Sequence, residues 1–217
     1  MAMFGLVFAL PAAVSRRAAR FAAKGFFRLT FLLLRAFCGV RVEVRGPVPR
    51  GPALIAGKHQ SMLDVFMLYE ALPEARFVMK RELVKAPVFG WYALRVGTVP
   101  VDRGGGSEAM REMVARMSAA HEEGGQLVIY PQGTRTPPGE TRPYKIGVHA
   151  LYETTGLPCI PAAANTGMIW PKGVAIHPGV AVVEFLPEIA PGMARAPFMA
   201  ILEREIERAS DALAADA

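Results

Sequence analysis

The chain has 217 residues, of which 52% are hydrophobic and 20% are charged, and its mean hydropathy is +0.26. This length is enough for one domain with a sizeable core, and so apolar a composition indicates contact with lipid. The two cysteines, Cys38 and Cys159, lie in apolar stretches without C-x-x-C spacing. That arrangement excludes a cysteine metal site and predicts buried thiols in a reducing compartment.

The net charge of +6 is concentrated near the N-terminus. Residues 1–42 hold seven basic residues and no acidic residue, whereas the rest of the chain is close to neutral. The positive charge is therefore a local feature, and we treat residues 1–38 as a unit distinct from residues 39–217.

The N-terminal unit reads as an amphipathic helix and not as a spanning one. The first 14 residues are apolar but shorter than the roughly 20 residues that a membrane-spanning helix needs. They also lack the charge order and the cleavage pattern of a signal peptide. A helix rich in Phe and Leu is predicted from Ser15 to about Cys38. Its basic residues recur every fourth position and share one stripe: Arg16, Arg20, Lys24 and Arg28.

A basic stripe on a Phe- and Leu-rich helix predicts an interfacial anchor on anionic lipid. It places the protein peripherally on the cytoplasmic face of the cytoplasmic membrane. Two alternatives are a core-packed helix with a solvated basic edge and a helix that binds nucleic acid. The absence of acidic residues disfavours the first, and the aliphatic neighbours disfavour the second. We therefore expect a membrane partner and no nucleic acid.

Beyond residue 38, apolar runs typical of strands alternate with helical patterns. Strands are predicted at residues 40–44, 53–57, 76–79, 98–101, 126–130, 157–164 and 180–185. Helices are predicted at residues 65–72, 86–96, 108–123, 148–155 and 197–215. This order predicts an α/β fold, in which a single layered domain has a largely parallel or mixed sheet flanked by helices.

A polar loop joins the strand at residues 53–57 to the following helix. Ser61 suits the N-cap of that helix, and Asp64 occupies its third position, close to a capping box. His59, two residues before the cap, then lies over the helix N-terminus beside the Asp64 carboxylate. That carboxylate can accept from one ring nitrogen and leave the other free to deprotonate a hydroxyl. The simpler alternative is that Asp64 only caps the helix.

Loops that follow predicted strands carry further polar side chains. They hold His59, Lys80, Arg103 and Arg135. If the strands are parallel, these loops open at one edge of the sheet, where α/β proteins bind their ligands. Arg offers a bidentate fork for phosphate oxygens and Lys a point charge, so the group suits a phosphate-bearing ligand. The backbone N–H groups of Gly133 and Thr134 can add hydrogen bonds to it.

Four motifs in order carry a family resemblance. They are His59-x4-Asp64, G-T-V-P-V-D-R at 97–103, Y-P-Q-G-T-R at 130–135 and L-P-C-I-P at 157–161. Together they resemble the sequence blocks of the glycerolipid acyltransferase family, whose bacterial members acylate 1-acyl-glycerol-3-phosphate. The resemblance covers residues 41–213. Two positions depart from the family pattern: Gln132 stands where the third block has Glu, and Lys58 stands where Asn precedes the His.

The resemblance implies a 1-acylglycerol-3-phosphate O-acyltransferase. Such an enzyme moves a fatty acyl chain from acyl-ACP or acyl-CoA to the sn-2 hydroxyl of lysophosphatidic acid, giving phosphatidic acid for phospholipid biosynthesis. It implies His59 as the base and Asp64 as its orienting partner, with no bound cofactor, no metal and no covalent enzyme intermediate. It also implies a set of residues around the glycerol phosphate: Lys80, Arg103, Gln132, Gly133, Thr134 and Arg135.

Several alternatives stay open at this point. Because Gln132 carries no charge, another lysolipid such as a lyso-ornithine lipid is an alternative acceptor. An inactive lipid-binding scaffold is disfavoured by the presence of both His59 and Asp64. A hydrolase that uses Ser61 is disfavoured by the lack of a G-x-S-x-G elbow. Lys145 is either a family element or a solvated lysine, and the aromatic helix at 86–96 is either core or a wall of an acyl tunnel.

Overall fold

The sheet is the frame of the molecule. The computed structural model describes residues 12, 13, 15–102, 106–122 and 124–216. Within them, seven strands form one sheet in the order β1-β7-β6-β2-β5-β3-β4. Every neighbouring pair is parallel except β6 and β7. The strands are β1 (Val40–Arg45), β2 (Ala53–Gly57), β3 (Ala75–Lys80), β4 (Val99–Val101), β5 (Gln126–Ile129), β6 (Cys159–Ala164) and β7 (Gly179–Phe185).

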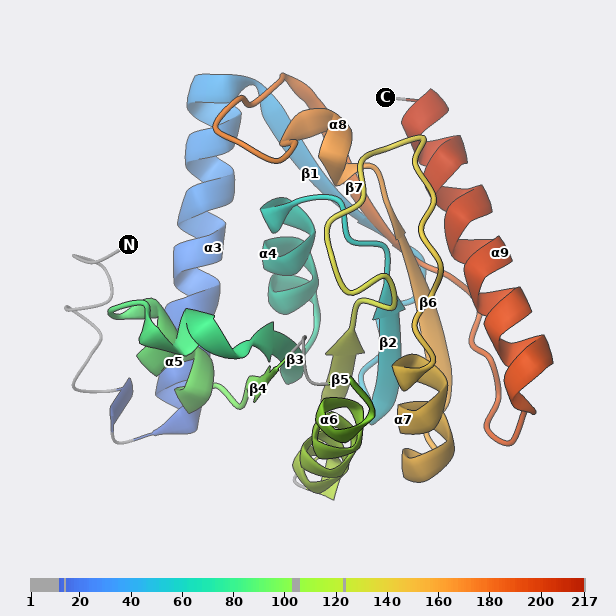
Figure 1. Cartoon of the computed structure of the whole chain (residues 1–217). Helices are drawn as coiled ribbons and strands as arrows, with labels where there is room; N and C mark the ends of the chain where they lie inside the picture. The colour runs from blue at the N-terminus through green and yellow to red at the C-terminus, as the bar shows by residue number, and fades with distance from the viewer. Residues whose placement is uncertain (1–11, 14, 103–105, 123, 217) are drawn as a thin grey trace.

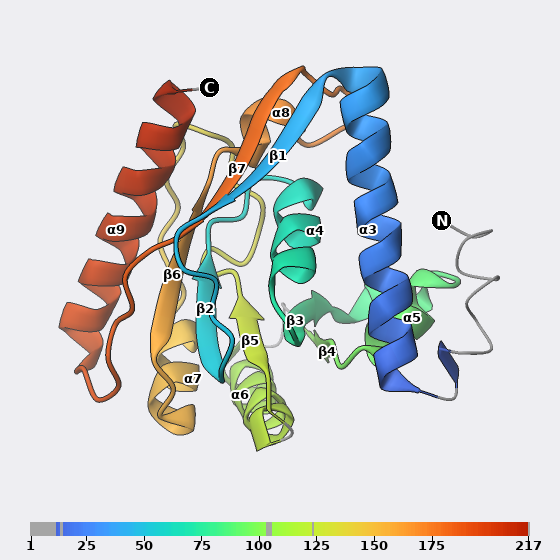
Figure 2. The ribbon, with the colours of Figure 1, turned by 180° about the vertical axis from the view of Figure 1, so that it is seen from behind.

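Helices cover both faces of this sheet (Figure 1 and Figure 2). They are α3 (Arg16–Cys38), α4 (Met62–Ala71), the 3-10 helix η1 (Arg81–Lys85), α5 (Phe89–Arg95), α6 (Gly106–Glu122), α7 (Gly147–Thr155), α8 (Thr166–Ile169) and α9 (Arg195–Ala215). Side chains alternate across β2, as the period of a strand requires. Ile55 joins the core formed with α3 and α4, whereas Leu54 joins the core formed with α6, α7 and α9. The predicted α/β fold is confirmed.

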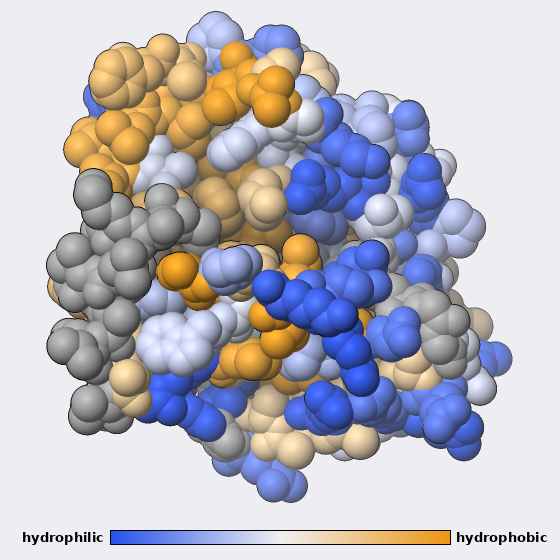
Figure 3. All heavy atoms as spheres, turned by 60° about the vertical axis from the view of Figure 1, so that its left-hand side comes forward, coloured by the Kyte–Doolittle hydropathy of each residue, from blue (hydrophilic) through white to orange (hydrophobic). Residues whose placement is uncertain are grey.

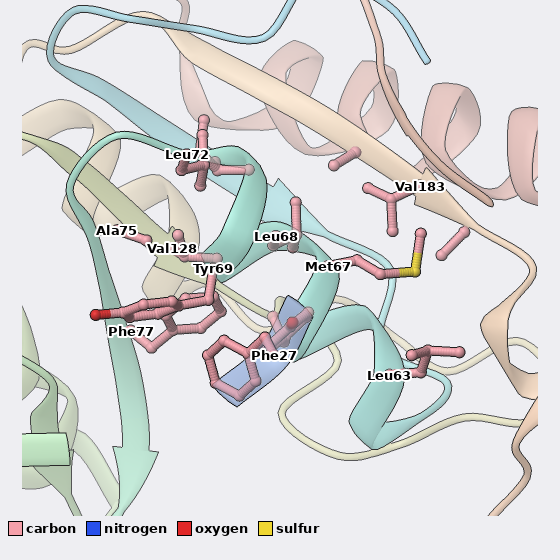
Figure 4. Close-up of a cluster of buried hydrophobic side chains, with 14 of the residues drawn as sticks. Phe27, Leu63, Met67, Leu68, Tyr69, Leu72, Ala75, Phe77, Val128 and Val183 are labelled. Atoms are coloured by element: carbon pink, nitrogen blue, oxygen red, sulfur yellow. The ribbon is translucent and has the colours of Figure 1, made fainter. Parts of the chain in front are cut away.

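The core beneath α4 sets the position of that helix (Figure 4). The rings of Phe27 from α3 and Tyr69 from α4 lie 5.3 Å apart, and Phe77 from β3 stacks on Tyr69 at 6.1 Å. Burial of one such side chain contributes about 1.5–3 kcal/mol. The core therefore holds α4, and with it the first helical turn that contains Asp64.

The predicted element boundaries agree with the structure to within three residues. Two helices nevertheless need comment, one for its late start and one because it was not predicted. The aromatic helix begins only at Phe89, after η1, because Val88 adopts φ +62, outside the right-handed helical region. The single turn α8 was not predicted, since four residues are too few to show a period. Cys159 is buried as predicted, and burial raises the pKa of its thiol, whereas Cys38 is only half-buried.

α3 contacts α4 through the basic stripe that the sequence predicted to face lipid. Arg20 pairs with Glu74 at 2.6 Å, and Arg28 pairs with Glu70 at 2.8 Å. The Nζ of Lys24 donates to two backbone oxygens at the end of α4, at 2.7 and 3.0 Å, where the helix dipole favours a cation. These three side chains of the stripe therefore have partners within the protein, and the contact of the stripe with anionic lipid stays a prediction.

Another face of α3 is apolar and exposed. Figure 3 shows an apolar area over the C-terminal half of this helix. Its large apolar side chains are between 41% and 82% exposed: Phe21, Leu29, Leu32, Leu33 and Phe37. Among the helices that the structure describes, none is both long enough and apolar enough to cross a bilayer.

Candidate active site

The loop after β2 is held by the start of α4. β2 is buried along its whole length and ends at Gly57, where a Cβ would lie 3.1 Å from the ring of Tyr130. Ser61 caps α4 with an Oγ that accepts from the N–H of Leu63 at 3.1 Å. The Oδ2 of Asp64 accepts from the N–H of Ser61 at 2.7 Å, which completes the capping box. The short stretch between strand and helix is therefore fixed at both ends.

Asp64 orients the ring of His59. Its Oδ1 lies 2.9 Å from the Nδ1 of His59, and its Oδ2 also accepts from the N–H of Gln60 at 2.9 Å and the hydroxyl of Thr166 at 3.2 Å. The carboxylate is fully buried, so these donors hold it in one orientation. Because Asp64 accepts at Nδ1, that nitrogen carries the proton and Nε2 keeps its lone pair. No other described group hydrogen-bonds to Nε2.

Tyr130 forms the floor under the imidazole. The two rings stack with centroids 4.1 Å apart and an interplanar angle of 19°. Burial raises the pKa of Tyr130 well above its usual value, and the nearby Asp64 charge raises it further, so the phenol stays neutral. The stacked ring limits rotation of His59 and leaves its edge, where Nε2 lies, as the open side. Sequence reasoning missed this role, although Tyr130 begins the Y-P-Q-G-T-R motif.

The sheet topology brings the predicted loops to one edge. β2, β3, β4, β5 and β6 run in one direction, so the segments that follow them open together. Lys80 lies at the end of β3, half-exposed and paired with Glu82 at 3.2 Å. Arg103, which follows β4, lies outside the described residues. Thr166, which follows β6, reaches Asp64 and had no signal in the sequence.

Arg135 is a cation without a carboxylate partner in the described part of the chain. Its Nη2 lies 3.9 Å from the Sδ of Met62, in the first turn of α4. The guanidinium is also close enough for its charge to lower the pKa of Tyr130 slightly against the effect of burial. Arg135 therefore extends across the helix start that carries Asp64 and remains available for an anion.

The turn at 131–134 differs from the predicted phosphate cradle. The N–H of Gly133 donates to the oxygen of Tyr130 at 2.9 Å, so that donor closes the turn, whereas the N–H of Thr134 makes no hydrogen bond with described residues. Gly133 adopts φ +70, and a Cβ there would lie 2.9 Å from the Nζ of Lys145. Lys145 thus crosses the turn and adds a cation at Gly133.

An ion pair between Lys58 and Glu207 lies next to His59. Lys58 is 3% exposed, and its Nζ lies 2.5 Å from the Oε2 of Glu207 on α9. The Oε1 of Glu207 accepts from the hydroxyl of Tyr144 at 2.8 Å and from the Nε2 of Gln132 at 3.3 Å. Glu207 was not predicted, because it lies far along the chain in a helix of mixed charge.

Ser61 is poorly placed for covalent chemistry. It is fully buried, and its Oγ donates to the backbone oxygen of Trp170 at 2.6 Å while it caps α4. A nucleophile needs an exposed oxygen beside a base. The hydroxyl is occupied on both sides, which counts against the hydrolase alternative.

An apolar cavity of about 520 Å³ opens beside the turn at 131–134. Its apolar wall comes from strands β3 to β5 and from α6 and α7: Val78, Val101, Met110, Met113, Ile129 and Val148. Tyr130, Gly133 and Lys145 line the same cavity, so it adjoins the floor of His59. No aromatic residue of α5 lines it. In the part of the chain that the structure describes, no three His, Cys, Asp or Glu side chains gather as metal ligands would.

Comparisons with known proteins agree on one family. A family model described as Acyltransferase matches residues 39–165. A curated 1-acyl-sn-glycerol-3-phosphate acyltransferase of Pseudomonas aeruginosa is 34% identical over 183 residues, which cover 83% of this chain and 71% of that protein. The protein of the same name in Saccharomyces cerevisiae is 28% identical over 75% of this chain and 56% of that protein. The 1-acyl-sn-glycerol-3-phosphate acyltransferase alpha of Homo sapiens is 29% identical over 64% of this chain and 50% of that protein.

The fold also matches a solved structure. The crystal structure of the 1-acyl-sn-glycerophosphate (LPA) acyltransferase PlsC from Thermotoga maritima aligns with a TM-score of 0.76. The alignment covers 97% of this chain and 89% of that one at 22% sequence identity. At this identity the likeness concerns the fold, whereas the site depends on the residues described above. This chain spans only about half of the yeast and human relatives.

Proposed function

The chain belongs to the acyltransferase family, and from that premise we propose that it acylates the sn-2 hydroxyl of 1-acyl-glycerol-3-phosphate. The acyl chain comes from a thioester, acyl-ACP or acyl-CoA, and the product is phosphatidic acid for phospholipid biosynthesis. The observation that carries the proposal is the contact between His59 and Asp64, which leaves Nε2 without a partner among the described residues. Tyr130 stacks on that ring and also senses the charge of Arg135, which has no carboxylate partner in the same part of the chain. A base and an anion-binding group therefore both lie near Tyr130.

The reaction follows from the ring geometry. His59 Nε2 takes the proton of the sn-2 hydroxyl while that oxygen forms a bond to the thioester carbonyl carbon. Asp64 holds the Nδ1–H tautomer and stabilises the imidazolium that results. The tetrahedral intermediate then collapses, the carbon–sulfur bond breaks, and the leaving sulfur receives the proton from His59.

Cations around the turn recognise the phosphate of the acceptor. Arg135 makes the main contact, because its guanidinium has no carboxylate partner in the described residues. Lys145 adds a second cation, and the N–H of Thr134, which has no partner among the described residues, adds a hydrogen bond. Lys80 and Arg103 complete the set by family resemblance, although Lys80 must leave Glu82 to do so.

The apolar cavity receives an acyl chain. Its volume of about 520 Å³ lies within the roughly 300–1,000 Å³ of ligand pockets. Apolar side chains form its depth, while Asp102, Ser107 and Lys145 are among the polar residues that line it. A hydrocarbon chain bound there lies beside Tyr130 and the edge of His59, as transfer requires.

α3 docks the enzyme on the membrane through its apolar exposed face. Arg17, Arg35 and Arg41 have no partner among the described residues, and the last two line a groove of about 480 Å³ between α3 and β1. Apolar side chains with unpaired arginines at their margin suit anionic lipid. We place the protein on the cytoplasmic face of the membrane, peripherally attached.

The test is an activity matrix with purified protein. Lysophosphatidic acid and a lyso-ornithine lipid serve as acceptors, each with acyl-ACP and with acyl-CoA. We expect phosphatidic acid from the first acceptor and little product from the second, since only the first carries a phosphate for Arg135. A preference for the phosphate-free acceptor would support the lyso-ornithine alternative that Gln132 suggests. Lysolipid binding without turnover for any donor would support a scaffold.

A further inference from the structure

Glu207 joins three segments that meet at the active site. It accepts from Lys58, the residue before His59, and from Gln132, in the turn before Arg135. It also accepts from Tyr144, in the segment that leads to α7. The Nζ of Lys58 reaches the same segment, at the backbone oxygen of Glu140, 3.5 Å away. α9 thus contacts both loops that carry the proposed chemistry.

The carboxylate of Glu207 determines how the amide of Gln132 is turned. A carboxylate facing an ammonium and a hydroxyl accepts hydrogen bonds only, so Gln132 must present its NH2 group to it. The Oε1 of Gln132 then points elsewhere. That oxygen is buried and has no hydrogen-bond partner in the described residues. A buried acceptor without a partner is rare and requires an explanation.

The two departures from the family pattern have one explanation in this network. Lys58 supplies the counter-charge that Glu207, whose side chain is only 14% exposed, needs. Gln132 supplies a neutral donor where a Glu would place a second carboxylate against the first. The acidic group expected at position 132 is therefore present, but it is contributed by α9.

We propose that Glu207 is a positioning residue that turns Gln132 so that its Oε1 accepts a hydrogen bond from the bound substrates. The inference rests on the proposed acyl transfer. The donor is an N–H or O–H group, and two sources have one: the hydroxyl of the acceptor lipid and the amides of the thioester carrier's pantetheine arm. Either contact places a substrate against the loop that holds His59.

The experiment exchanges the amide and the carboxylate. Gln132→Glu, Glu207→Gln and the double exchange are compared with the wild-type enzyme, and kcat and KM are measured for each substrate in turn. Gln132→Glu should lower kcat/KM by about 10²-fold and Glu207→Gln by about tenfold, since misplacement of a binding group has effects of this size. The double exchange restores one acid and one amide and should return to within about threefold of wild type.

The kinetic constants identify the contact. A rise in KM for lysophosphatidic acid assigns the donor to the acceptor hydroxyl, and a rise in KM for the thioester assigns it to the carrier arm. Glu205→Gln is the matched control, because Glu205 lies on the same helix but pairs with Arg204 and Arg208 at the surface. It should leave both constants unchanged.

Several outcomes would overturn the proposal. Folded single variants with wild-type constants would remove the role of Glu207 and leave the proposed function intact. A double exchange that loses as much activity as the product of the single losses would do the same. Thermal unfolding of each variant separates misfolding from misplacement, and the double exchange conserves charge and volume. No product from the wild-type enzyme with any donor would contradict both proposals.

Discussion

Lys58 and His59 are neighbours in the chain, yet each pairs with a carboxylate on a different side of the sheet. His59 contacts Asp64 on α4 at 2.9 Å, and Lys58 contacts Glu207 on α9 at 2.5 Å. The two helices lie on either side of β2 in both ribbon views (Figure 1 and Figure 2). The two pairs look alike in distance and burial but differ in what remains unbonded. Nε2 of His59 has no described partner, whereas Lys58 is enclosed by α9 and the segment before α7.

The comparison shows that Lys58 and His59, although adjacent in the chain, have different roles. The pair with a free nitrogen suits proton transfer, and the enclosed pair suits the fixing of loops. Loss of Asp64 should therefore affect turnover more than folding, and loss of Lys58 should do the reverse. The predictions below test this division.

The largest effect is expected from Asp64→Asn. An amide can present its NH2 group to Nδ1, which stabilises the tautomer with its proton on Nε2 and removes the base. The kcat should fall by about 10³- to 10⁴-fold. Initial rates of phosphatidic acid formation give the measurement, with circular dichroism as the control for folding. A loss below tenfold in a folded variant would contradict the role assigned to Asp64.

The second effect is on stability. Lys58→Met leaves the carboxylate of Glu207 without its counter-charge and should lower the free energy of unfolding by about 3–5 kcal/mol. The double variant Lys58→Met with Glu207→Met should recover part of that loss, because an apolar pair of similar volume has no charge to solvate, while Tyr144 and Gln132 lose their acceptor. Urea unfolding measures both. An unchanged midpoint for Lys58→Met would show that the pair does not stabilise the fold.

The third effect concerns the acceptor. Arg135→Gln should lower kcat/KM for lysophosphatidic acid by about 10- to 100-fold, since a hydrogen bond to a charged group contributes about 1.5–3 kcal/mol. Arg135→Lys keeps the charge but loses the bidentate fork, so its kcat/KM should lie between those of the wild-type enzyme and Arg135→Gln. An equal loss toward a phosphate-free lysolipid would show that Arg135 does not recognise phosphate.

The smallest effect is expected at the membrane face. Leu32→Gln combined with Phe37→Gln removes two exposed apolar side chains of α3 and should weaken binding to anionic vesicles by about tenfold. Turnover of detergent-solubilised substrate should not change. The control is Ala212→Gln, an exposed position on α9. Unchanged vesicle binding, measured by sedimentation, would remove this face from the membrane contact.

Contacts between residues close together in the sequence could be predicted, whereas contacts between distant segments could not. The contact of His59 with Asp64 was predictable because five residues and one helix cap determine it. The contact of Lys58 with Glu207 spans 149 residues and depends on where α9 crosses the sheet. The basic stripe of α3 shows a second limit. The helical period predicts which residues share a face of α3, but it does not predict that Arg20, Lys24 and Arg28 face α4.

The most direct test of the central claim is acyl transfer to lysophosphatidic acid by the His59→Ala variant. His177→Ala, at an exposed histidine outside the site, is the matched control. The account predicts that His59→Ala folds normally and loses at least about 10³-fold in phosphatidic acid formation, while the control keeps wild-type activity. Undiminished turnover by a folded His59→Ala enzyme would contradict it.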